Sequence, residues 1–282
     1  MKTLGDLDPL YRASRKVLLD ALEALGPHRD AIILVGAHAI YLVAGEGDVN
    51  VPPFTTDADL AIDPGLLRPE PLMEKVMTVA GFSTKGNPIG RWSIETTIDG
   101  KPIKVLVDFL VPEAVSGAGT RAARLGPHGN RIARKARGLE AVLVDKDIME
   151  ISLEGDPRTY RIAAAGLAAL LISKLYKIAE RGDEEDPETN KDALDVLRIL
   201  RAAPVAELAR RYRRVLESLV AADVALGAMQ HLGNLFGTPR STGSRRAGQA
   251  AAPFEDADVI AASSAALAND LLRAIGEQRA DA

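Results

Sequence analysis

The sequence predicts an α/β domain, a mixed sheet with flanking helices, followed by a C-terminal helical domain. Short apolar or alternating runs at residues 31–35, 55–62 and 103–111 are typical of strands. An Asp99-Gly100 pair between two alternating runs predicts a β-hairpin. From Ala163 onward, apolar residues recur at helical spacing. We therefore expect the α/β domain at residues 1–158 and the helical domain at residues 159–282.

The individual elements follow from apolar spacing and from turn residues. In the first domain we expect helices over 8–26, 37–44 and 69–80, a hairpin of 91–98 with 103–111, and a second hairpin of 141–144 with 148–153. In the second domain we expect helices over 163–181, 190–202, 204–219 and roughly 255–278. Residues 237–253 have few bulky side chains, which predicts a mobile linker.

Composition excludes several classes of protein. The chain has 282 residues, of which 47% are apolar and 26% charged, so it can bury a core. It has no cysteine, which excludes disulfide scaffolds, thiolate zinc sites and cysteine nucleophiles. The net charge of −4 argues against general coating of nucleic acid, but it allows a local basic patch. The apolar run 163–172 is too short to cross a bilayer and the acidic start differs from a signal peptide, so we expect a cytoplasmic protein without a membrane partner.

The segment Asp57-Ala58-Asp59 is the strongest candidate for chemistry. The chain has other Asp-x-Asp pairs, which we interpret as a solvated terminus, a helix start and a polar turn. Only Asp57 and Asp59 lie two apart on an expected strand, so their side chains share one face. Two adjacent carboxylates repel each other unless a cation or proton lies between them. A divalent ion with oxygen ligands, Mg²⁺ above all, fits this pair.

Two further features support a site near these acids. Asp108 interrupts the apolar strand 104–111, where a carboxylate is costly unless it is bound to metal or paired with an Arg or Lys. Gly36 ends the first strand, where it permits close approach of a phosphate to a helix start. His38 follows it and is either a substrate contact or a half-buried structural histidine.

The order of these residues resembles the nucleotidyltransferase fold of the DNA polymerase β superfamily. Its signature is a glycine motif, a pair of acids two apart, and a third acid on a neighbouring strand. Here Gly36, Asp57 with Asp59, and Asp108 match those places, and Ala37 stands in the place of a second glycine. Thr55-Thr56 before the acids is similar to AbiEii-type toxins, the group that includes the mycobacterial MenT toxins. The expected fold is thus an α/β nucleotidyltransferase fold with a C-terminal helical domain.

The helical half adds to the resemblance. That toxin group has a lysine-bearing helix, then a helix with an Arg/Lys-Asp-x-x-Asp segment, and Lys174, Lys177 and Asp192 match these places. The resemblance implies that Gly36, Ala37, Thr55, Thr56, Lys174 and Lys177 bind an NTP. It implies two Mg²⁺ ions on Asp57, Asp59 and Asp108, with Asp108 also activating the acceptor hydroxyl. Asp192 would orient a lysine or contact the nucleotide.

The implied activity is transfer of NMP from an NTP to an acceptor hydroxyl, with release of pyrophosphate. The tRNA 3′ end is the favoured acceptor, which implies the toxin of a toxin-antitoxin pair with a cognate antitoxin. A basic stretch at residues 116–138 supports RNA contact through Arg121, Arg124, Arg131, Arg134, Lys135 and Arg137. A second arginine cluster at residues 210–214 and Trp92 are weaker candidates. Alternatives are a nucleotidyltransferase for a small molecule of aminoglycoside type or for a protein, and a non-catalytic, nucleotide-binding partner of antitoxin type.

Overall fold

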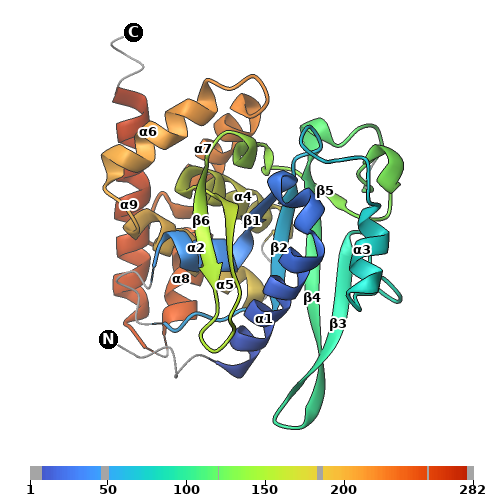
Figure 1. The fold of residues 1–282 in the computed structure, drawn as a ribbon. Helices are drawn as coiled ribbons and strands as arrows, with labels where there is room; N and C mark the ends of the chain where they lie inside the picture. The colour runs from blue at the N-terminus through green and yellow to red at the C-terminus, as the bar shows by residue number, and fades with distance from the viewer. Residues whose placement is uncertain (1–7, 46–50, 120, 183–186, 253, 278–282) are drawn as a thin grey trace. The chain divides into compact units, whose positions relative to one another are not determined.

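The structure is a computed structural model that describes residues 8–45, 51–119, 121–182, 187–252 and 254–277. It divides into two compact units (Figure 1). The sheet unit comprises the described residues of Met1–Leu42, Pro52–Ala136 and Lys146–Ala165. The helical unit comprises those of Val43–Val51, Arg137–Asp145 and Gly166–Ala282. Each unit is therefore assembled from segments that are separated along the chain.

The described part of the sheet unit is built on a mixed, seven-stranded sheet. Its strands are β1 (Ile32–Val35), β2 (Asp57–Ile62), β3 (Arg91–Ile98), β4 (Lys101–Pro112), β5 (Arg134–Ala136), β6 (Lys146–Ser152) and β7 (Thr159–Ala165). The order is β3-β4-β2-β1-β7-β6, and β5 pairs with the end of β4 beyond β3. Strand β2 runs antiparallel to β1 and parallel to β4. The expected mixed sheet with flanking helices is confirmed.

Helices of the sheet unit begin where the sequence supplies a cap or a turn. Helix α1 (Pro9–Ala24) starts after Asp8, whose carboxylate accepts hydrogen bonds from the backbone N–H groups of Leu10 and Tyr11. It packs against β2, β3 and β4. The other α-helices described in this unit are α2 (Gly36–Val43) and α3 (Met73–Val79). Helix α3 is shorter than the expected 69–80, because the prolines that precede it cannot continue a helix.

The hairpin of β3 and β4 has the expected turn but a tighter loop. Ile98 pairs with Lys101, so the loop is Asp99-Gly100 alone. Both residues have positive φ, 51° and 76°, which is the conformation that a two-residue turn joining twisted strands requires. This loop length fixes the register of the whole hairpin and brings Arg91 opposite Asp108.

The second expected hairpin is wrong. Residues Glu140–Leu143 form a short 3₁₀ helix, and β6 pairs instead with β7, over residues that we expected to begin a helix. Alanines at 163–165 favour helix by propensity, but pairing of Ala163 with Ile33 of β1 overrides that preference. The sheet therefore extends to Ala165, seven residues beyond the expected domain boundary at residue 158.

The helical unit contains one helix where we expected a linker. Its described helices are α4 (Leu167–Arg181), α5 (Pro187–Arg201), α6 (Val205–Leu216), α7 (Ala222–Phe236), α8 (Thr242–Ala251) and α9 (Ala257–Glu277). Helix α8 lies inside the expected mobile linker 237–253, and α7 was not anticipated. The small residues of α8 are there for close packing: a Cβ on Gly243 would lie 2.7 Å from the Phe236 ring. The small side chains of this segment therefore allow close contacts between helices, and the expected mobile linker is wrong.

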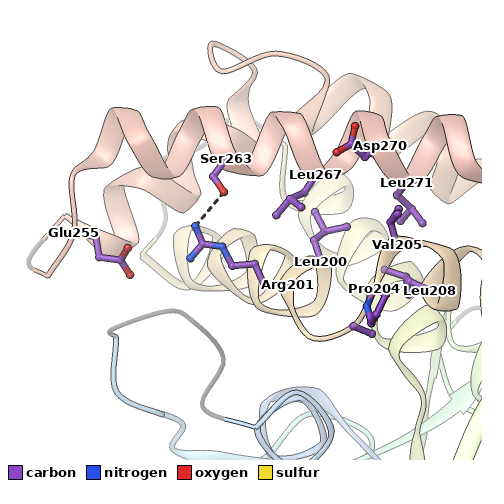
Figure 2. A pocket seen from close by; sticks show the side chains of 11 residues that line it. Leu200, Arg201, Pro204, Val205, Leu208, Glu255, Ser263, Leu267, Asp270 and Leu271 are labelled. Carbon is purple, nitrogen blue, oxygen red and sulfur yellow. Dashed lines mark hydrogen bonds between the residues drawn. The ribbon is translucent and has the colours of Figure 1, made fainter.

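A cavity of about 700 Å³ lies within the helical unit, between α9 and the α5–α6 corner (Figure 2). Leu200, Leu208 and Leu271 supply apolar lining, and Arg201 donates a hydrogen bond to Ser263 across it. The lining includes none of the residues that sequence singled out. The cavity therefore gives no support to the expected chemistry.

Helix α9 is long and apolar enough to cross a membrane by length and composition alone. A helix was expected here, over roughly 255–278, but not one of this apolar composition. Ile260, Leu271 and Ile275 of α9 are buried, and α9 packs against α8 and α6. A core helix passes the same composition test, so the feature is weak evidence for a membrane span.

Asp145 joins two segments of the helical unit. Its Oδ2 accepts hydrogen bonds from the backbone N–H groups of Ala168 and Ala169, which lie in the first turn of α4. Its Oδ1 accepts from Arg211 at 2.8 Å and lies 3.3 Å from the guanidinium of Arg214. The carboxylate is fully buried, and these two backbone N–H groups and two guanidiniums are its partners.

The change Asp145→Asn is expected to lower the free energy of unfolding by about 3 kcal/mol, because it removes the buried charge that pairs with Arg211 and Arg214 and replaces one acceptor oxygen by a donor. Urea unfolding measures the effect as a shift in midpoint at constant slope. The exposed Glu150 on β6 offers a control, since Glu150→Gln should leave the midpoint unchanged. Equal midpoints for both variants would contradict the stabilising role of Asp145 at the start of α4.

Candidate functional site

The three predicted acids lie on neighbouring strands of the sheet unit. Asp57 and Asp59 lie two apart on β2, so their side chains project from one face. Asp59 and Asp108 are direct partners in the parallel pairing of β2 with β4, which puts Asp108 on that same face. The alternate residues Ala58 and Leu60 are fully buried on the opposite face. The strand register thus places the three acids on one face of the sheet.

Gly36 lies directly against the Asp59 side chain. It begins α2 with a φ of +67°, a conformation that favours glycine. A Cβ at this position would come within 2.9 Å of Asp59 Cβ and Cγ and would overlap the carboxylate. Ala37 and His38 follow in the first turn of α2 and are both buried. Gly36 therefore permits the close approach of α2 to Asp59.

The change Gly36→Ala is expected to displace Asp59 and to destabilise the chain by about 1–3 kcal/mol, the usual cost of a strained φ. Gly155 provides the matched control, because it has a φ of +83° with open space around it. Gly155→Ala should reproduce the strain without touching the acids. Thermal unfolding and the activity expected from the resemblance, measured on both variants, separate strain from displacement; equal activity in the two would contradict the contact with Asp59.

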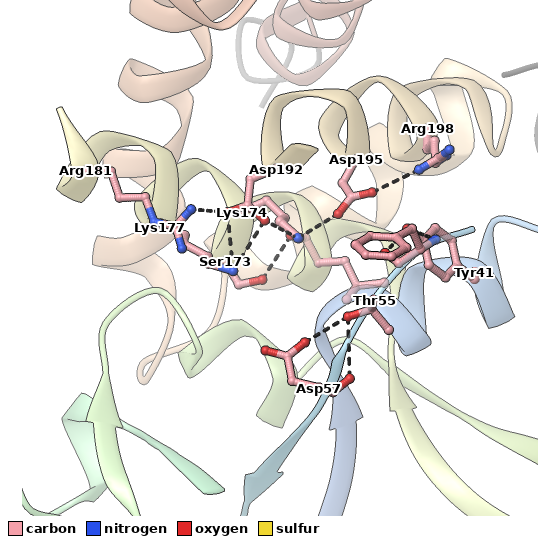
Figure 3. Close-up of polar contacts among 12 residues, drawn as sticks. Tyr41, Thr55, Asp57, Ser173, Lys174, Lys177, Arg181, Asp192, Asp195 and Arg198 are labelled. Atoms are coloured by element: carbon pink, nitrogen blue, oxygen red, sulfur yellow. Dashed lines mark hydrogen bonds and ion pairs between the residues drawn. The ribbon is translucent and has the colours of Figure 1, made fainter. Parts of the chain in front are cut away.

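Thr55 holds Asp57 in place. The Thr55 hydroxyl is buried and donates a hydrogen bond of 2.8 Å to Asp57 Oδ1 (Figure 3). The backbone carbonyl of Thr55 in turn accepts from Ser14 of α1, whose hydroxyl also lies 3.1 Å from His38 Nε2. His38 is thus buried in a structural hydrogen-bond network, while Thr56 is exposed. The predicted nucleotide-binding Thr55 is placed to orient an acid.

Asp108 is paired with two arginines, which is the alternative that the sequence left open for it. Arg91 of β3 donates two hydrogen bonds, from Nε to Oδ1 at 2.7 Å and from Nη2 to Oδ2 at 2.9 Å. Arg134 of β5 adds a third, to Oδ2 at 3.0 Å. Asp108 is 2% exposed, whereas the arginine side chains are about one third exposed. Asp108 is therefore engaged by protein cations instead of lying bare beside Asp59.

The charges around Asp108 decide its protonation. Burial by itself would raise the pKa of Asp108, but hydrogen bonds and charge from Arg91, with Arg134, hold that pKa below its ordinary value. The pKa of Arg91 is raised, first by its hydrogen bonds to Asp108 and also by the charges of Asp57 and Asp59. The guanidinium of Arg91 therefore interacts electrostatically with all three carboxylates. Sequence reasoning missed Arg91, although the hairpin register counted from Asp99-Gly100 pairs it with Asp108.

The donor set fits one divalent ion better than two. Asp57 and Asp59 offer two half-exposed carboxylates on one face, which suits a hard cation. Within the described residues, no three His, Cys, Asp or Glu side chains form a group that could hold a metal ion. The third expected ligand, Asp108, has its oxygens committed to arginine. The two β2 acids are thus the residues that would hold Mg²⁺.

Lys174 is buried inside an ion network of the helical unit. Its ammonium lies 2.5 Å from Asp192 Oδ1 and 2.7 Å from Asp195 Oδ2, and the side chain is 5% exposed (Figure 3). Burial would lower the pKa of Lys174, but the two carboxylates raise it above its ordinary value. For Asp192, burial opposes the charges of Lys174 and Lys177, and the pKa falls to about 2. Lys174 is therefore paired with both carboxylates, and its expected contact with a triphosphate stays a prediction.

The exposed cations of this network lie on the next turns of α4. Lys177 and Arg181 approach Asp192 at 3.3 and 3.1 Å, and their side chains are 44% and 31% exposed. Arg198 of α5 donates a hydrogen bond to Asp195 and another to the backbone carbonyl of Val51. It therefore connects α5 to the chain at Val51. Asp192 thus orients Lys174 and Lys177, which agrees with one of its two expected roles.

The predicted RNA-contact residues do not share one environment. Arg121, Arg124 and Arg131 are exposed in the sheet unit. Arg134 holds Asp108, and Lys135 donates to the carbonyl of Gly117. The sixth residue, Arg137, belongs to the helical unit, where its guanidinium lies 5.7 Å from the centre of the Tyr176 ring. Three of the six are therefore available as a basic surface of the sheet unit.

The weaker candidates are largely structural. Trp92 is 1% exposed, and its indole N–H donates to the carbonyl of Ile132, so it is a core residue. In the 210–214 cluster, Arg211 and Arg214 pair with Asp145, and Arg213 donates to the carbonyl of Ala274.

Comparison with known proteins gives the family. No significant match was found among curated proteins or among solved structures. Residues 15–220 match a family model described as nucleotidyltransferase, which covers the sheet unit from within α1 and the helical unit through α6. The match includes β2 with its acids, Asp108 with both arginines, and the Lys174 network. Since it spans well over half of the chain, this protein belongs to that nucleotidyltransferase family.

Proposed function

We propose that the protein transfers NMP from an NTP to an acceptor hydroxyl, with a tRNA 3′ end as the preferred acceptor. In this reaction the acceptor oxygen forms a bond to the α-phosphorus, the bond from that phosphorus to the bridging oxygen breaks, and pyrophosphate and a proton are released. The observation that carries the proposal is the paired face of Asp57 and Asp59 on β2, with Gly36 against Asp59. Family membership supports the general class of reaction.

The carboxylates of the sheet unit position the nucleotide. Asp57 and Asp59 would hold Mg²⁺, and Thr55 fixes the rotamer of Asp57 through its hydrogen bond. A divalent ion there would neutralise phosphate charge and align the reacting oxygens. Transfer of this kind depends on positioning and charge compensation more than on covalent protein chemistry. The pre-set geometry of the two acids is therefore the main contribution of the sheet unit.

Within the helical unit, the resemblance assigns Lys174 and Lys177 to the NTP. Lys177 is a better candidate than Lys174, because its ammonium is partly exposed and shares Asp192 with two other cations. Arg181 is a second candidate, because its planar guanidinium can donate two parallel hydrogen bonds to phosphate oxygens. Lys174 keeps Asp192 and Asp195 in place and so supports both.

Three arginines favour a polyanionic acceptor. Arg121, Arg124 and Arg131 are exposed on one segment of the sheet unit, and exposed arginines of this kind contact nucleic-acid phosphates without reading sequence. Together with the resemblance to AbiEii-type toxins, they support tRNA over a small acceptor. The protein would then act in the cytoplasm as a growth-inhibiting toxin, with a cognate antitoxin as partner.

The decisive experiment incubates the protein with total tRNA, Mg²⁺ and each NTP in turn, labelled on the α- or the γ-phosphate. Label from the α-phosphate alone should enter RNA with the wild type and not with Asp59→Asn. Incorporation of γ-label would mean phosphoryl transfer and overturn the proposal. Label in protein or in a small acceptor would move the function to the corresponding transferase, and NTP binding without incorporation would favour a non-catalytic partner.

A further inference from the structure

A protein cation lies among the carboxylates of the sheet unit. Arg91 and Asp108 are register partners across the β3–β4 hairpin, and their two parallel hydrogen bonds form a bidentate pair. Asp59 is the register partner of Asp108 on the other side. Along this line of the sheet the order is therefore Arg91, Asp108, Asp59, all projecting from one face.

This pair is built into the fold. The tight Asp99-Gly100 turn sets the register, so Arg91 cannot shift along β3 without disturbing the entire hairpin. Asp108 is almost fully buried and receives three hydrogen bonds from guanidinium groups. Binding a second ion at Asp108 would require both arginines to leave a buried carboxylate, which costs more than exchanging surface partners.

We propose that Arg91 is a fixed cation of this site and takes the place of a second divalent ion, so that the acids bind one ion, through Asp57 and Asp59. The inference rests on the proposed function. Both guanidiniums are paired with Asp108, so this carboxylate already has protein cations as partners beside the two acids of β2. Asp108 is then a positioning residue that aims Arg91.

Arg91 also retains capacity to bind phosphate. Two of its nitrogens serve Asp108, and Nη1 has no hydrogen bond to any residue that the structure describes. The side chain is 35% exposed, so the two N–H groups of Nη1 can meet a phosphate oxygen. Asp108, with its lowered pKa and occupied oxygens, is poorly suited to take the proton of the acceptor hydroxyl.

Mn²⁺ is the probe that tests the inference. Its aqua ion gives an electron paramagnetic resonance signal that is lost on binding, so the number of ions per chain is measured without any turnover. The full-length wild type should bind one Mn²⁺, and Asp59→Asn should lose it. Asp108→Asn should still bind one, because Asp108 does not hold the ion.

Removing the arginine should open a second site. Arg91→Ala should bind two Mn²⁺ ions, and the double variant Arg91→Ala/Asp108→Asn should return to one. Arg134→Ala is the matched control, since it removes one contact of Asp108 but keeps the bidentate pair, and its count should remain at one. Circular dichroism establishes that each variant is folded.

The contrary outcomes are separable. Two ions in the wild type, with one lost in Asp108→Asn, would overturn the role of Arg91 and leave the proposed transferase intact. A count of one in folded Arg91→Ala would also overturn it. No Mn²⁺ on the wild type would overturn both the inference and the metal part of the proposed function. If Arg91→Ala fails to fold, the comparison of wild type with Asp108→Asn still decides.

Discussion

Nucleotidyl transfer by Asp59→Asn is expected to fall by on the order of 10²–10³-fold, because the carboxylate that aligns the phosphate-bound cation loses its charge. The variant should fold normally, since Asp59 is half-exposed and asparagine has nearly the same shape. Incorporation of α-labelled nucleotide at saturating NTP, compared with wild type, measures the effect.

Asp63 supplies the control for Asp59. It lies just beyond the end of β2, where it pairs with Lys146 at 3.8 Å and accepts from the backbone of Gly65. Asp63→Asn changes the same charge near the same strand, and its activity should remain within about twofold of wild type, as expected for a weak surface pair. A similar loss in both variants would mean that net charge, and not the position of Asp59, controls the rate.

Replacing Lys174 with methionine is expected to destabilise the chain by about 3–5 kcal/mol, because Asp192 and Asp195 are left buried with less counter-charge. Methionine keeps most of the side-chain volume, so the loss is electrostatic and not a packing defect. Chemical unfolding at neutral pH measures it. The expected size is large compared with the 5–15 kcal/mol that holds most domains folded.

Lys177 provides the matched exposed lysine on the same helix. It contacts the same Asp192, but 44% of its side chain is exposed, so Lys177→Met should cost about 1 kcal/mol or less. Lys177→Met should instead weaken NTP binding. The reverse pattern, with a stable Lys174→Met protein that cannot bind NTP, would return Lys174 to its expected role against the triphosphate.

The same network gives a dependence on pH. Asp192 has a pKa of about 2 in the folded chain, below its ordinary value of 3.8. Its contribution to stability is therefore complete above about pH 4 and is lost as the pH falls toward 2. In Asp192→Asn this acid-sensitive component should be absent, and unfolding midpoints measured between pH 5 and pH 2 should fall less steeply than in the wild type.

Sequence predicted best what depends on local pattern. The Asp-x-Asp pair, the strands that carry it and the two-residue turn at Asp99 follow from period-two spacing and turn chemistry. The resemblance implied a third acid on a neighbouring strand, and Asp108 on β4 is the register partner of Asp59. These features need no knowledge of how distant helices pack.

What the sequence missed depends on tertiary contacts. The burial of Lys174 could not be predicted from the sequence, because its partners, Asp192 and Asp195, lie on another helix. Helix α8 reads as a linker because the glycines that usually interrupt a helix serve here for close packing. The last three residues of β7, 163–165, were predicted as helix because these alanines favour helix, and their pairing with β1 makes them strand. In each case a contact distant in sequence outweighed the local preference.

Because the segments of the two units alternate along the chain, they affect the order in which each unit can fold during synthesis and the positions at which the chain can be divided into fragments. Residues 137–145 belong to the helical unit, yet the ribosome makes them before β6 and β7, which complete the sheet. Asp145 can therefore form its contacts only after α4 and the arginines of α6 have been synthesised. A fragment that starts at Gly166 would contain every described helix from α4 to α9 but no cap for the first of them. Dissection of this protein should keep residue 137 onward together.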